Sequence, residues 1–578
     1  MPYLHLFKKW ILPLILVSMV IVLGCGGGDS QNQPSSSTDS QIKSDRLAEE
    51  TVTFRASEEI AQLNIIFKNG EEAGELSIVE SLGGGVGVFD YDQDGWLDLI
   101  FPGGGKLSES TLAGLPTRIL RQSAPEKFTD VSHVAGTEIV RNYTHGIANG
   151  DYNNDGFTDV LITGYGGLQL LTNNGDGSFS DVTEQVGLDD RSWSTSAAWG
   201  DFNNDGFLDI YITHYVDWSF DNNPICFNQD GQRDVCAPKV FTGLDDVVYL
   251  NSGDGTFAAK RASVGLSPEG KGLGVLLADW DEDGDLDIYV ANDTVPNFYY
   301  SNNGRATFTE KALISGLAID DMANPNGSMG LAVIDFDRDH RADLFVTNYE
   351  EELSALYRNM GDENFGYESR QAGLNRLGKL FVGFGCVAGD FDLDGDHDIV
   401  ISNGHAVRYP TNGDLEQEPL LLINEEGRLN RMKTAPSSYF AQTHRGRGLA
   451  MGDINRDGQL DLVFANILEP AVLLYGEVQQ PQKRVFVTLV GRKVNRDAIG
   501  ARVCVRLKTS ELVGWTTSGI GYLSSSPNEL MYVIPDEEVI KEIEVMWPGG
   551  DVSTVSSDYL DLRMNNQEFC RVRIVQNR

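Results

Sequence analysis

A nine-residue acidic motif returns seven times along this chain of 578 residues and constrains its fold more than any other feature. Every copy carries Asp or Asn at positions 1, 3 and 5 and Asp at position 9. Successive copies begin 50 to 78 residues apart, close to the length of a four-stranded propeller blade with loop insertions. The copies begin at Asp90, Asp151, Asp201, Asp279, Asp335, Asp390 and Asp453.

The motif has the composition of a loop that wraps a hard cation such as Ca²⁺, which takes roughly six to eight oxygen ligands in irregular geometry. Position 7 varies freely, as expected if it offers only its backbone carbonyl. We therefore predict up to seven Ca²⁺ ions as cofactors. Their predicted ligands are Asp90, Asp92, Asp94, Trp96, Asp98, Asp151, Asn153, Asp155, Phe157, Asp159, Asp201, Asn203, Asp205, Phe207, Asp209, Asp279, Asp281, Asp283, Asp285, Asp287, Asp335, Asp337, Asp339, Arg341, Asp343, Asp390, Asp392, Asp394, Asp396, Asp398, Asp453, Asn455, Asp457, Gln459 and Asp461.

The fifth loop departs from the pattern at position 6. Six copies have Gly there, where a sharp turn with positive φ costs least, and the fifth has His340. Its neighbour Arg341 also brings a competing positive charge. We therefore expect the fifth loop to be the weakest of the seven sites.

An EF-hand is the obvious alternative, because its twelve-residue loop also begins with spaced acidic ligands. It requires a Glu at position 12 and flanking helices, whereas position 12 is apolar in all seven copies, as at Val290. Runs such as 286–290 are β-branched and aromatic and follow a Gly-containing turn, which predicts strands. A further alternative is Asp-Asn-Gly turn chemistry without a metal. Seven copies in register favour the metal hypothesis.

The segments between the motifs predict an all-β fold. In the second repeat, four strand-like segments surround the loop and a later Asn-Gly-Asp-Gly turn, which makes one four-stranded blade. The seventh repeat has three such segments, and an unassigned β-like segment at 51–54 precedes the first repeat. We therefore predict a seven-bladed β-propeller over 51–480, closed by this N-terminal segment, and a small β-rich C-terminal domain over 481–578.

The N-terminal residues predict export. Residues 1–25 carry basic residues and then an apolar run too short to span a bilayer, which is typical of a signal peptide. The run ends in Val-Leu-Gly-Cys, which resembles a bacterial lipobox with Cys25 as the lipidation site. Residues 26–50 are polar and predict a disordered tether. We expect a lipid-anchored, extracytoplasmic protein of the bacterial cell envelope.

Charge and cysteine usage agree with an exported binding protein. The formal net charge of −40 argues against nucleic acid or an anionic membrane surface as a partner. Cys226 and Cys236 lie in a long insertion, where an oxidising compartment favours a disulfide. Cys504 and Cys570 are candidates for a second bridge. Cys386 stands in an apolar strand and is expected in the core.

Several short motifs flank the acidic loops or follow them. They are Lys-Gly-Leu-Gly at 271–274, Ser-Met-Gly at 328–330, Asn-Gly-His at 403–405, Asn-Arg-Asp-Ala-Ile-Gly-Ala-Arg-Val at 495–503, Gly-Tyr-Leu-Ser at 521–524 and Val-Met-Trp-Pro-Gly-Gly at 545–550. The acidic loops resemble the FG-GAP or VCBS repeats of integrin α-chain propellers, and these motifs resemble the ASPIC/UnbV, or cartilage acidic protein, family. That resemblance implies a calcium-binding propeller with an appended β-rich domain and no settled activity.

Two function hypotheses of different classes remain. The chain has no nucleophile elbow, phosphate-binding Gly loop or zinc-binding motif, and His145, His405 and His444 are more readily structural than a shared site. The preferred hypothesis is a non-catalytic, calcium-binding, lipid-anchored cell-envelope protein that mediates protein or glycan interaction or adhesion. The alternative is an envelope enzyme or carbohydrate-binding protein that uses the propeller mouth. A deep polar pocket with convergent titratable groups away from the loops would favour the alternative.

Overall fold

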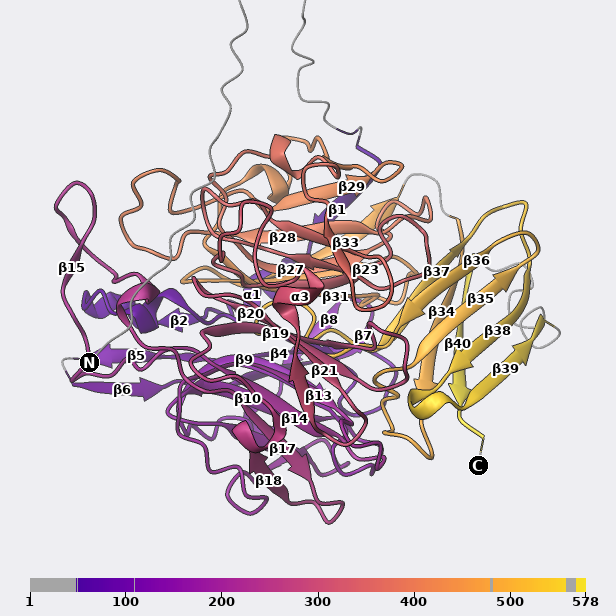
Figure 1. The fold of residues 1–578 in the computed structure, drawn as a ribbon, viewed down its shortest axis with the longest axis horizontal. Helices are drawn as coiled ribbons and strands as arrows, with labels where there is room; N and C mark the ends of the chain where they lie inside the picture. Colours follow the sequence, from indigo (N-terminus) through magenta and orange to yellow (C-terminus); the bar gives the residue numbers. More distant parts are fainter. Residues whose placement is uncertain (1–47, 49, 109, 479–481, 558–567, 578) are drawn as a thin grey trace, which may run out of the picture. The chain divides into compact units, whose positions relative to one another are not determined.

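The computed structural model describes residues 48, 50–108, 110–478, 482–557 and 568–577 (Figure 1). All of these residues belong to one compact unit. The predicted signal peptide, the lipidation site Cys25 and nearly all of the predicted tether lie outside the described residues. None of the helices in the described part is long and apolar enough to cross a membrane.

Seven four-stranded antiparallel sheets make up the repeat region, and each one contains a nine-residue loop between its first two strands. In chain order, the first four sheets are β3 (Gly87–Phe89), β4 (Asp98–Phe101), β7 (Arg118–Ala124), β8 (Lys127–Asp130); β9 (Tyr143–Gly150), β10 (Asp159–Tyr165), β11 (Gln169–Asn173), β12 (Phe179–Asp181); β13 (Ser194–Gly200), β14 (Asp209–His214), β17 (Val247–Asn251), β18 (Phe257–Lys260); and β19 (Gly272–Ala278), β20 (Asp287–Asn292), β21 (Phe298–Asn302), β22 (Phe308–Glu310).

The remaining three sheets follow the same order, and the last one takes its fourth strand from the N-terminus. They are β23 (Leu331–Ile334), β24 (Asp343–Val346), β25 (Ala355–Asn359), β26 (Phe365–Tyr367); β27 (Gly383–Gly389), β28 (Asp398–Asn403), β29 (Leu420–Asn424), β30 (Leu429–Arg431); and β31 (Gly446–Gly452), β32 (Asp461–Asn466), β33 (Val472–Val478), β1 (Val52–Ala56).

The N-terminal strand β1 completes the seventh sheet, as the strand count predicts. It pairs antiparallel with β33, with Val52 opposite Val478 and Ala56 opposite Leu474. Val52 is buried, and the ring of Phe54 packs against Phe391 and Phe440. Pairing therefore covers the edge of β33, which would otherwise present unpaired backbone groups to another chain.

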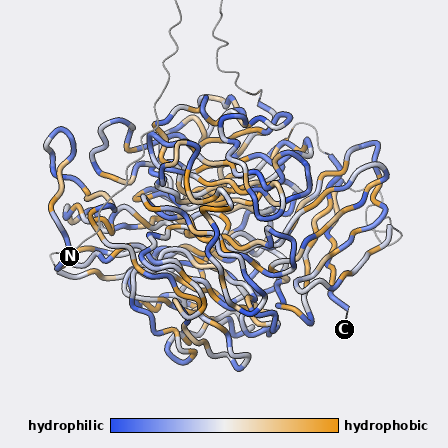
Figure 2. The backbone as a smooth tube through the Cα atoms, viewed as in Figure 1, coloured by the Kyte–Doolittle hydropathy of each residue, from blue (hydrophilic) through white to orange (hydrophobic). Residues whose placement is uncertain are grey.

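The first strands of the seven sheets contact one another in chain order, from β3 through β9, β13, β19, β23 and β27 to β31, and β31 contacts β3. These strands are almost entirely buried, because neighbouring sheets pack face to face through apolar side chains. Hydrophobic segments follow the strands while the loops are hydrophilic (Figure 2). The acidic loops therefore stand on a rigid apolar framework.

The C-terminal residues form two further sheets around their own core. Its buried core side chains include Val485, Val503, Ile543 and Trp547. One sheet is β37 (Glu529–Ile534), β34 (Lys483–Val490) and β40 (Phe569–Val575), and the other is β36 (Glu511–Trp515), β35 (Arg502–Leu507), β38 (Ile540–Met546) and β39 (Val552–Ser556).

The segment 516–528, between β36 and β37, leaves this core and runs along the first strands of the repeat sheets. Backbone N–H groups of Val88, Ile147, Leu277 and Leu331 donate to carbonyl oxygens of residues 525, 523, 518 and 521 at 2.9–3.0 Å. Tyr522 is fully buried and packs on a Phe of β27. The C-terminal domain that follows the repeats therefore also contacts the first strands of four repeat sheets through this segment.

Smaller elements decorate the sheets. A disulfide joins Cys226 and Cys236 across a hairpin, and Cys386 is buried in β27 as expected. Cys504 is a free thiol beside Glu511, so the candidate bridge to Cys570 is wrong. These elements are α1 (Glu58–Leu63), α2 (Ser132–Ala135), α3 (Ala312–Ser315), the 3₁₀ turns η1 (Glu71–Ala73), η2 (Ile78–Ser81), η3 (Pro238–Val240), η4 (Ala262–Val264), η5 (Leu374–Arg376), η6 (Tyr439–Ala441) and η7 (Pro548–Gly550), and strands β2 (Lys68–Asn69), β5 (Gly104–Ser108), β6 (Thr111–Gly114), β15 (Cys226–Phe227) and β16 (Arg233–Asp234).

Candidate metal centres

All seven acidic loops share one backbone conformation. Position 6 has positive φ throughout, between 88° and 96° for the six glycines and 68° for His340. Position 4 is also left-handed in every loop, with φ between 58° and 63°. The position 4 residues are Gln93, Asn154, Asn204, Glu282, Arg338, Leu393 and Arg456. A residue other than glycine is strained when its backbone is in the left-handed region, so the packing of the loop must hold it in place.

The carboxylate at position 1 sits at the centre of each loop. Its Oδ2 accepts a hydrogen bond from the backbone N–H of position 6 at 2.8–3.1 Å in all seven copies. In three loops its other oxygen, Oδ1 of Asp90, Asp335 and Asp453, is buried without a hydrogen-bond partner. A buried carboxylate oxygen without a donor is destabilising unless a cation binds it, so these residues fit a metal ion.

Positions 5 and 7 are linked in every copy. The position 5 carboxylate accepts the backbone N–H of position 7 at 2.8–3.0 Å, as between Asp283 and Asp285. This bond explains why the side chain at position 7 is unrestricted, since only its main chain is engaged. The predicted role of its carbonyl oxygen as a ligand stays a prediction.

The aspartate at position 9 is completely buried in all seven loops. Its Oδ1 accepts the backbone N–H of a residue on the third strand at 2.7–3.0 Å in every sheet. Burial raises the pKa of Asp98 to about 8 and that of Asp159 to about 9. Position 9 therefore fixes the loop to the sheet.

Four loops bring three carboxylates within 4.8 Å of one another. In the first, fourth and fifth loops these are positions 1, 3 and 5, and in the sixth they are Asp390, Asp392 and Asp398. The second, third and seventh loops have Asn at position 3, whose Nδ2 donates to the position 5 carboxylate at 2.8–2.9 Å. The structure thus gathers the predicted side-chain ligands loop by loop.

Arginine side chains contact carboxylates of several loops. Arg121 binds Asp92 and Asp94 in the first loop, at 2.5 and 2.9 Å. Arg358 binds Asp337 in the fifth loop, and Arg338 binds Asp396 in the sixth. Competition from a positive charge is therefore shared by several loops, and Arg341, which binds Asp339 at 2.8 Å, does not single out the fifth. The feature that distinguishes the fifth loop is the non-Gly residue His340 in its turn.

The C-terminal domain rests directly on the acidic loops. Asp497 accepts the backbone N–H of Asp151 at 2.9 Å, and the Arg496 side chain lies 3.4 Å from the Asp151 carboxylate. Arg571 binds the carboxylate of Asp453. The backbone N–H of Gly549 donates to the carbonyl oxygen of Gly284 in the fourth loop. A cavity of about 360 Å³ separates the domain from the fifth and sixth loops. The acidic loops and the C-terminal domain are thus in contact.

Five asparagines that sequence reasoning did not single out tie each of five sheets to the preceding loop. Each ends a third strand, and its Nδ2 donates to the backbone carbonyl of position 2 in the preceding loop at 2.7–3.3 Å. They are Asn173, Asn251, Asn302, Asn359 and Asn424. Their common sequence signal is an Asn that closes a strand before a Gly-containing turn.

Replacing Asn251 by Ala is expected to lower the free energy of unfolding by about 1–3 kcal/mol, because the carbonyls of Tyr152 and Leu208 lose their donor in a buried site. The measurement is denaturant unfolding of the calcium-loaded chain. The exposed Asn303 is the matched control, and Asn303→Ala should change this free energy by less than about 0.5 kcal/mol. Equal effects of both variants would show that the hydrogen bonds of Asn251 do not stabilise the fold.

The three histidines considered as a shared site have separate partners. His145 accepts a hydrogen bond from Trp193 Nε1, His405 accepts one from the Val407 backbone, and His444 contacts Glu469. Burial lowers the pKa of His145 to about 3 and that of His405 to about 4. These contacts give each histidine its own structural role.

Comparison with known proteins identifies both regions. A model of FG-GAP-like repeats matches residues 90–162, 151–212, 227–290, 279–346 and 335–401, more than half of the chain. A model described as ASPIC and UnbV matches residues 491–564. Four of the five matches span two successive acidic loops, and the match over 227–290 contains the fourth loop alone.

Two curated relatives show a more distant sequence similarity to this chain. Cartilage acidic protein 1 of Xenopus tropicalis is 25% identical over 334 residues, and human cartilage acidic protein 1 is 28% identical over 210 residues. These alignments cover 55% and 34% of this chain but only 48% and 29% of the relatives, so the chain spans about half or less of their length.

Among solved structures, an Agrocybe aegerita lectin that recognises non-reducing terminal N-acetylglucosamine is 18% identical, with 66% of this chain and 88% of the lectin covered. The TM-score of this comparison is 0.39. The chain belongs to the family of proteins with FG-GAP-like repeats, and its C-terminal residues 491–564 match the ASPIC and UnbV domain.

Proposed function

We propose that the chain is a calcium-binding, non-catalytic interaction protein of the cell exterior, built on a closed seven-bladed propeller. One observation carries the calcium assignment: seven loops of identical conformation each present a central position 1 carboxylate, and in three of them an oxygen of this buried group has no protein donor. Oxygen-only ligand sets of this kind suit Ca²⁺ better than a transition metal.

The closed propeller is supported by two independent sets of contacts. The first strands contact one another in an order that returns from β31 to β3, and β1 supplies the fourth strand of the seventh sheet. In this arrangement the segment 516–528 would fill the central channel, because its backbone bonds to first strands from different sheets. Such a plug leaves no open tunnel for a substrate.

A binding role is supported by the engagement of the loop carboxylates and of the histidines in structural contacts. The loop carboxylates at positions 1, 5 and 9 are engaged in hydrogen bonds, as in the fourth loop, and the histidines have structural partners. The relatives named cartilage acidic protein and the disulfide Cys226–Cys236 agree with an extracellular location. We further propose lipidation at Cys25 and a protein or glycan partner, both inferred from the sequence.

Equilibrium dialysis of the metal-stripped full-length chain, with the bound calcium counted by elemental analysis, tests the central assignment. We expect up to seven Ca²⁺ per chain, bound at about 10⁻⁴–10⁻³ M as in extracellular modules. Magnesium at the same concentration is the control, because it demands tighter octahedral geometry and should compete poorly. Binding of fewer than two calcium ions per chain would overturn the assignment.

The fifth loop is expected to be the weakest of the seven sites, because His340 adopts a φ of 68° that glycine accepts at lower cost. Calcium anomalous scattering from crystals grown at limiting calcium should show lower occupancy at Asp335 than at Asp279. The variant His340→Gly is the matched test and should raise the occupancy of the fifth site. Equal occupancy in the unmodified protein would contradict the argument from turn strain.

A further inference from the structure

A cavity of about 190 Å³ lies at the ends of the strands remote from the acidic loops. Its wall includes Leu273 and Phe384, near the starts of β19 and β27, and Met329, just before β23. Ile78 and Leu82 add to this apolar wall from the region of η2. The acidic loops follow the opposite ends of the same first strands, so the cavity belongs to none of the candidate metal centres.

Segments from two different repeats form one side of this wall. One is residues 235–239, which contains the disulfide-bonded Cys236, and the other contains Ala406 and Val407. Asp234 joins the two, because its carboxylate accepts the backbone N–H groups of Arg408 and Tyr409 at 2.9 and 3.0 Å. The wall is therefore fixed before any ligand arrives, which lowers the entropic cost of binding.

Two half-buried carboxyl groups line the apolar cavity. Asp293 accepts the hydroxyl hydrogen of Tyr215 at 2.5 Å, and Glu352 accepts the backbone N–H of Gly327 at 2.8 Å. Neither carboxyl forms an ion pair within the part of the chain that the structure describes. The positive group that acts on Asp293 is Lys271, whose Nζ donates to the backbone of residue 238.

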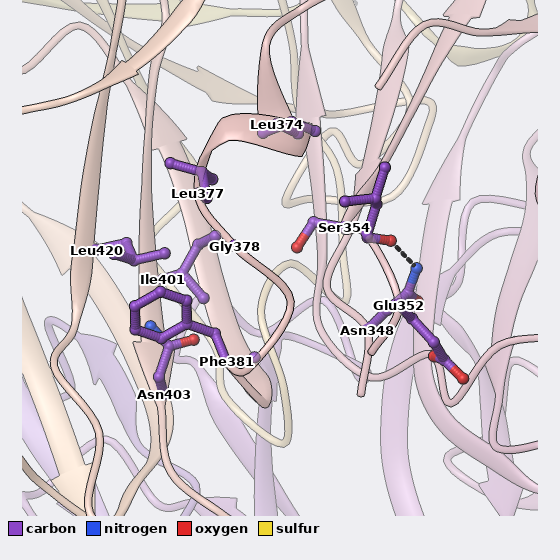
Figure 3. Close-up of a pocket in the computed structure, with 12 residues that line it drawn as sticks. Asn348, Glu352, Ser354, Leu374, Leu377, Gly378, Phe381, Ile401, Asn403 and Leu420 are labelled. Atoms are coloured by element: carbon purple, nitrogen blue, oxygen red, sulfur yellow. Dashed lines mark hydrogen bonds between the residues drawn. The ribbon is translucent and has the colours of Figure 1, made fainter. Parts of the chain in front are cut away.

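A second, smaller cavity of about 20 Å³ also has Glu352 in its wall (Figure 3). Leu374, Leu377 and Phe381 line it, and Asn348 donates to a backbone carbonyl beside it. A space of this size holds about one water molecule. Any larger ligand that reaches Glu352 must therefore occupy the 190 Å³ cavity.

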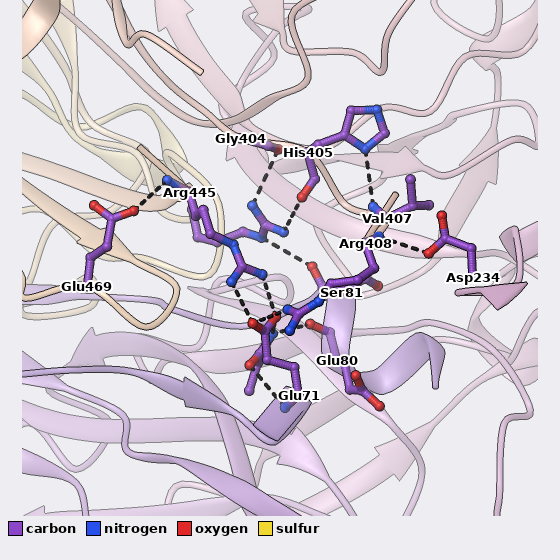
Figure 4. A network of polar contacts seen from close by, with 12 residues as sticks. Glu71, Glu80, Ser81, Asp234, Gly404, His405, Val407, Arg408, Arg445 and Glu469 are labelled. Carbon is purple, nitrogen blue, oxygen red and sulfur yellow. Dashed lines mark hydrogen bonds and ion pairs between the residues drawn. The ribbon is translucent and has the colours of Figure 1, made fainter. Parts of the chain in front are cut away.

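Glu71 is a buried carboxylate outside this cavity whose negative charge is balanced by arginine side chains. Its oxygens bind the guanidinium groups of Arg445 and Arg408 (Figure 4). Burial raises the pKa of Glu71, but the two arginines outweigh it and hold the pKa at about 2. Burial instead raises the pKa of Asp293 to about 6 and that of Glu352 to about 7, because no arginine offsets it.

We propose that this cavity binds a small amphiphilic amine, whose apolar body packs against the wall and whose ammonium group is held by Asp293 and Glu352. An ammonium offers three donors and no acceptor, which matches two carboxylates that form no ion pair within the described residues. A carboxylate ligand would be repelled, and a sugar would place unsatisfied hydroxyl groups against apolar side chains. The site shares no residue with the acidic loops, so it does not depend on the calcium assignment.

Calorimetric titration of the calcium-loaded full-length chain with three probes of equal length tests the charge preference. The probes are hexylamine, hexan-1-ol and hexanoate. Hexylamine is expected to bind at least about tenfold more tightly than hexan-1-ol, because it adds charge-assisted hydrogen bonds to the same apolar contact. Hexanoate should bind most weakly. Equal affinity for the amine and the alcohol, or no binding of any probe, would overturn the proposal.

Variants locate the site. Glu352→Gln and Asp293→Asn should each weaken hexylamine binding by about tenfold and leave hexan-1-ol binding unchanged. Glu351→Gln removes a neighbouring exposed carboxylate and is the control, with unchanged binding of both probes. Ala406→Leu fills the cavity and should abolish both. Circular dichroism melting confirms that each variant is folded. Hexylamine binding that survives both carboxyl substitutions would place the amine elsewhere and refute the proposal.

Discussion

Excess chelator is expected to lower the melting temperature of the full-length chain by about 10 °C. Each site at tenfold excess over its dissociation constant contributes RT ln 11, roughly 1.4 kcal/mol, so seven sites contribute about 10 kcal/mol. That is comparable to the whole stability of a domain, about 5–15 kcal/mol. At roughly 2.1 cal/mol/K per residue, unfolding of the repeat region has an entropy of about 0.9 kcal/mol/K. Dividing the lost free energy of about 10 kcal/mol by this entropy gives a melting temperature lower by about 10 °C.

The structural reason is the concentration of carboxylates in each loop. In the fourth loop Asp279, Asp281 and Asp283 have oxygens within 4.8 Å of one another. Without a cation these groups repel one another across a short distance, and the loop also supports the C-terminal domain through Gly284. Differential scanning calorimetry in calcium, in chelator and after calcium is restored measures the effect. An unchanged melting temperature in excess chelator would falsify the calcium assignment as a source of stability.

The acidic loops could be read from the sequence because their ligands are close together in the chain. Positions 1 to 9 recur with fixed types, and the observed hydrogen bonds of Asp279 and Asp283 stay within the loop. The pairing of β1 with β33 was also predictable, since an uneven strand count leaves one edge without a partner. Local periodicity and strand counting therefore recover the repeat architecture.

Other features depend on contacts that no local pattern encodes. The left-handed residue at position 4 is Gln93, Leu393 or Arg456 in different loops, so no glycine marks it. The segment 516–528 follows first strands hundreds of residues away in the sequence. The cavity with Asp293 and Glu352 combines residues from several repeats and from the disulfide hairpin. Side-chain identity alone cannot place such partners, because only the folded arrangement of repeats brings them together.

Deleting residues 51–56 is expected to destabilise the chain by at least about 5 kcal/mol, because it removes a whole strand with the buried Val52 and the partly buried Phe54. Val52 is 1% exposed, and Phe54 packs between the rings of Phe391 and Phe440. The deletion also exposes the full edge of β33, which pairs with β1 over five residues. Thermal unfolding and light scattering should show a lower melting temperature together with self-association.

A second deletion separates this effect from the loss of the N-terminal extension itself. Removing residues 30–44, which are polar and precede the strand, should leave both stability and the monomeric state unchanged. The register sets Val52 beside Val478, so the deletion of 51–56 acts on the edge of β33. A monomer of undiminished stability after that deletion would show that the seventh sheet is held by other contacts.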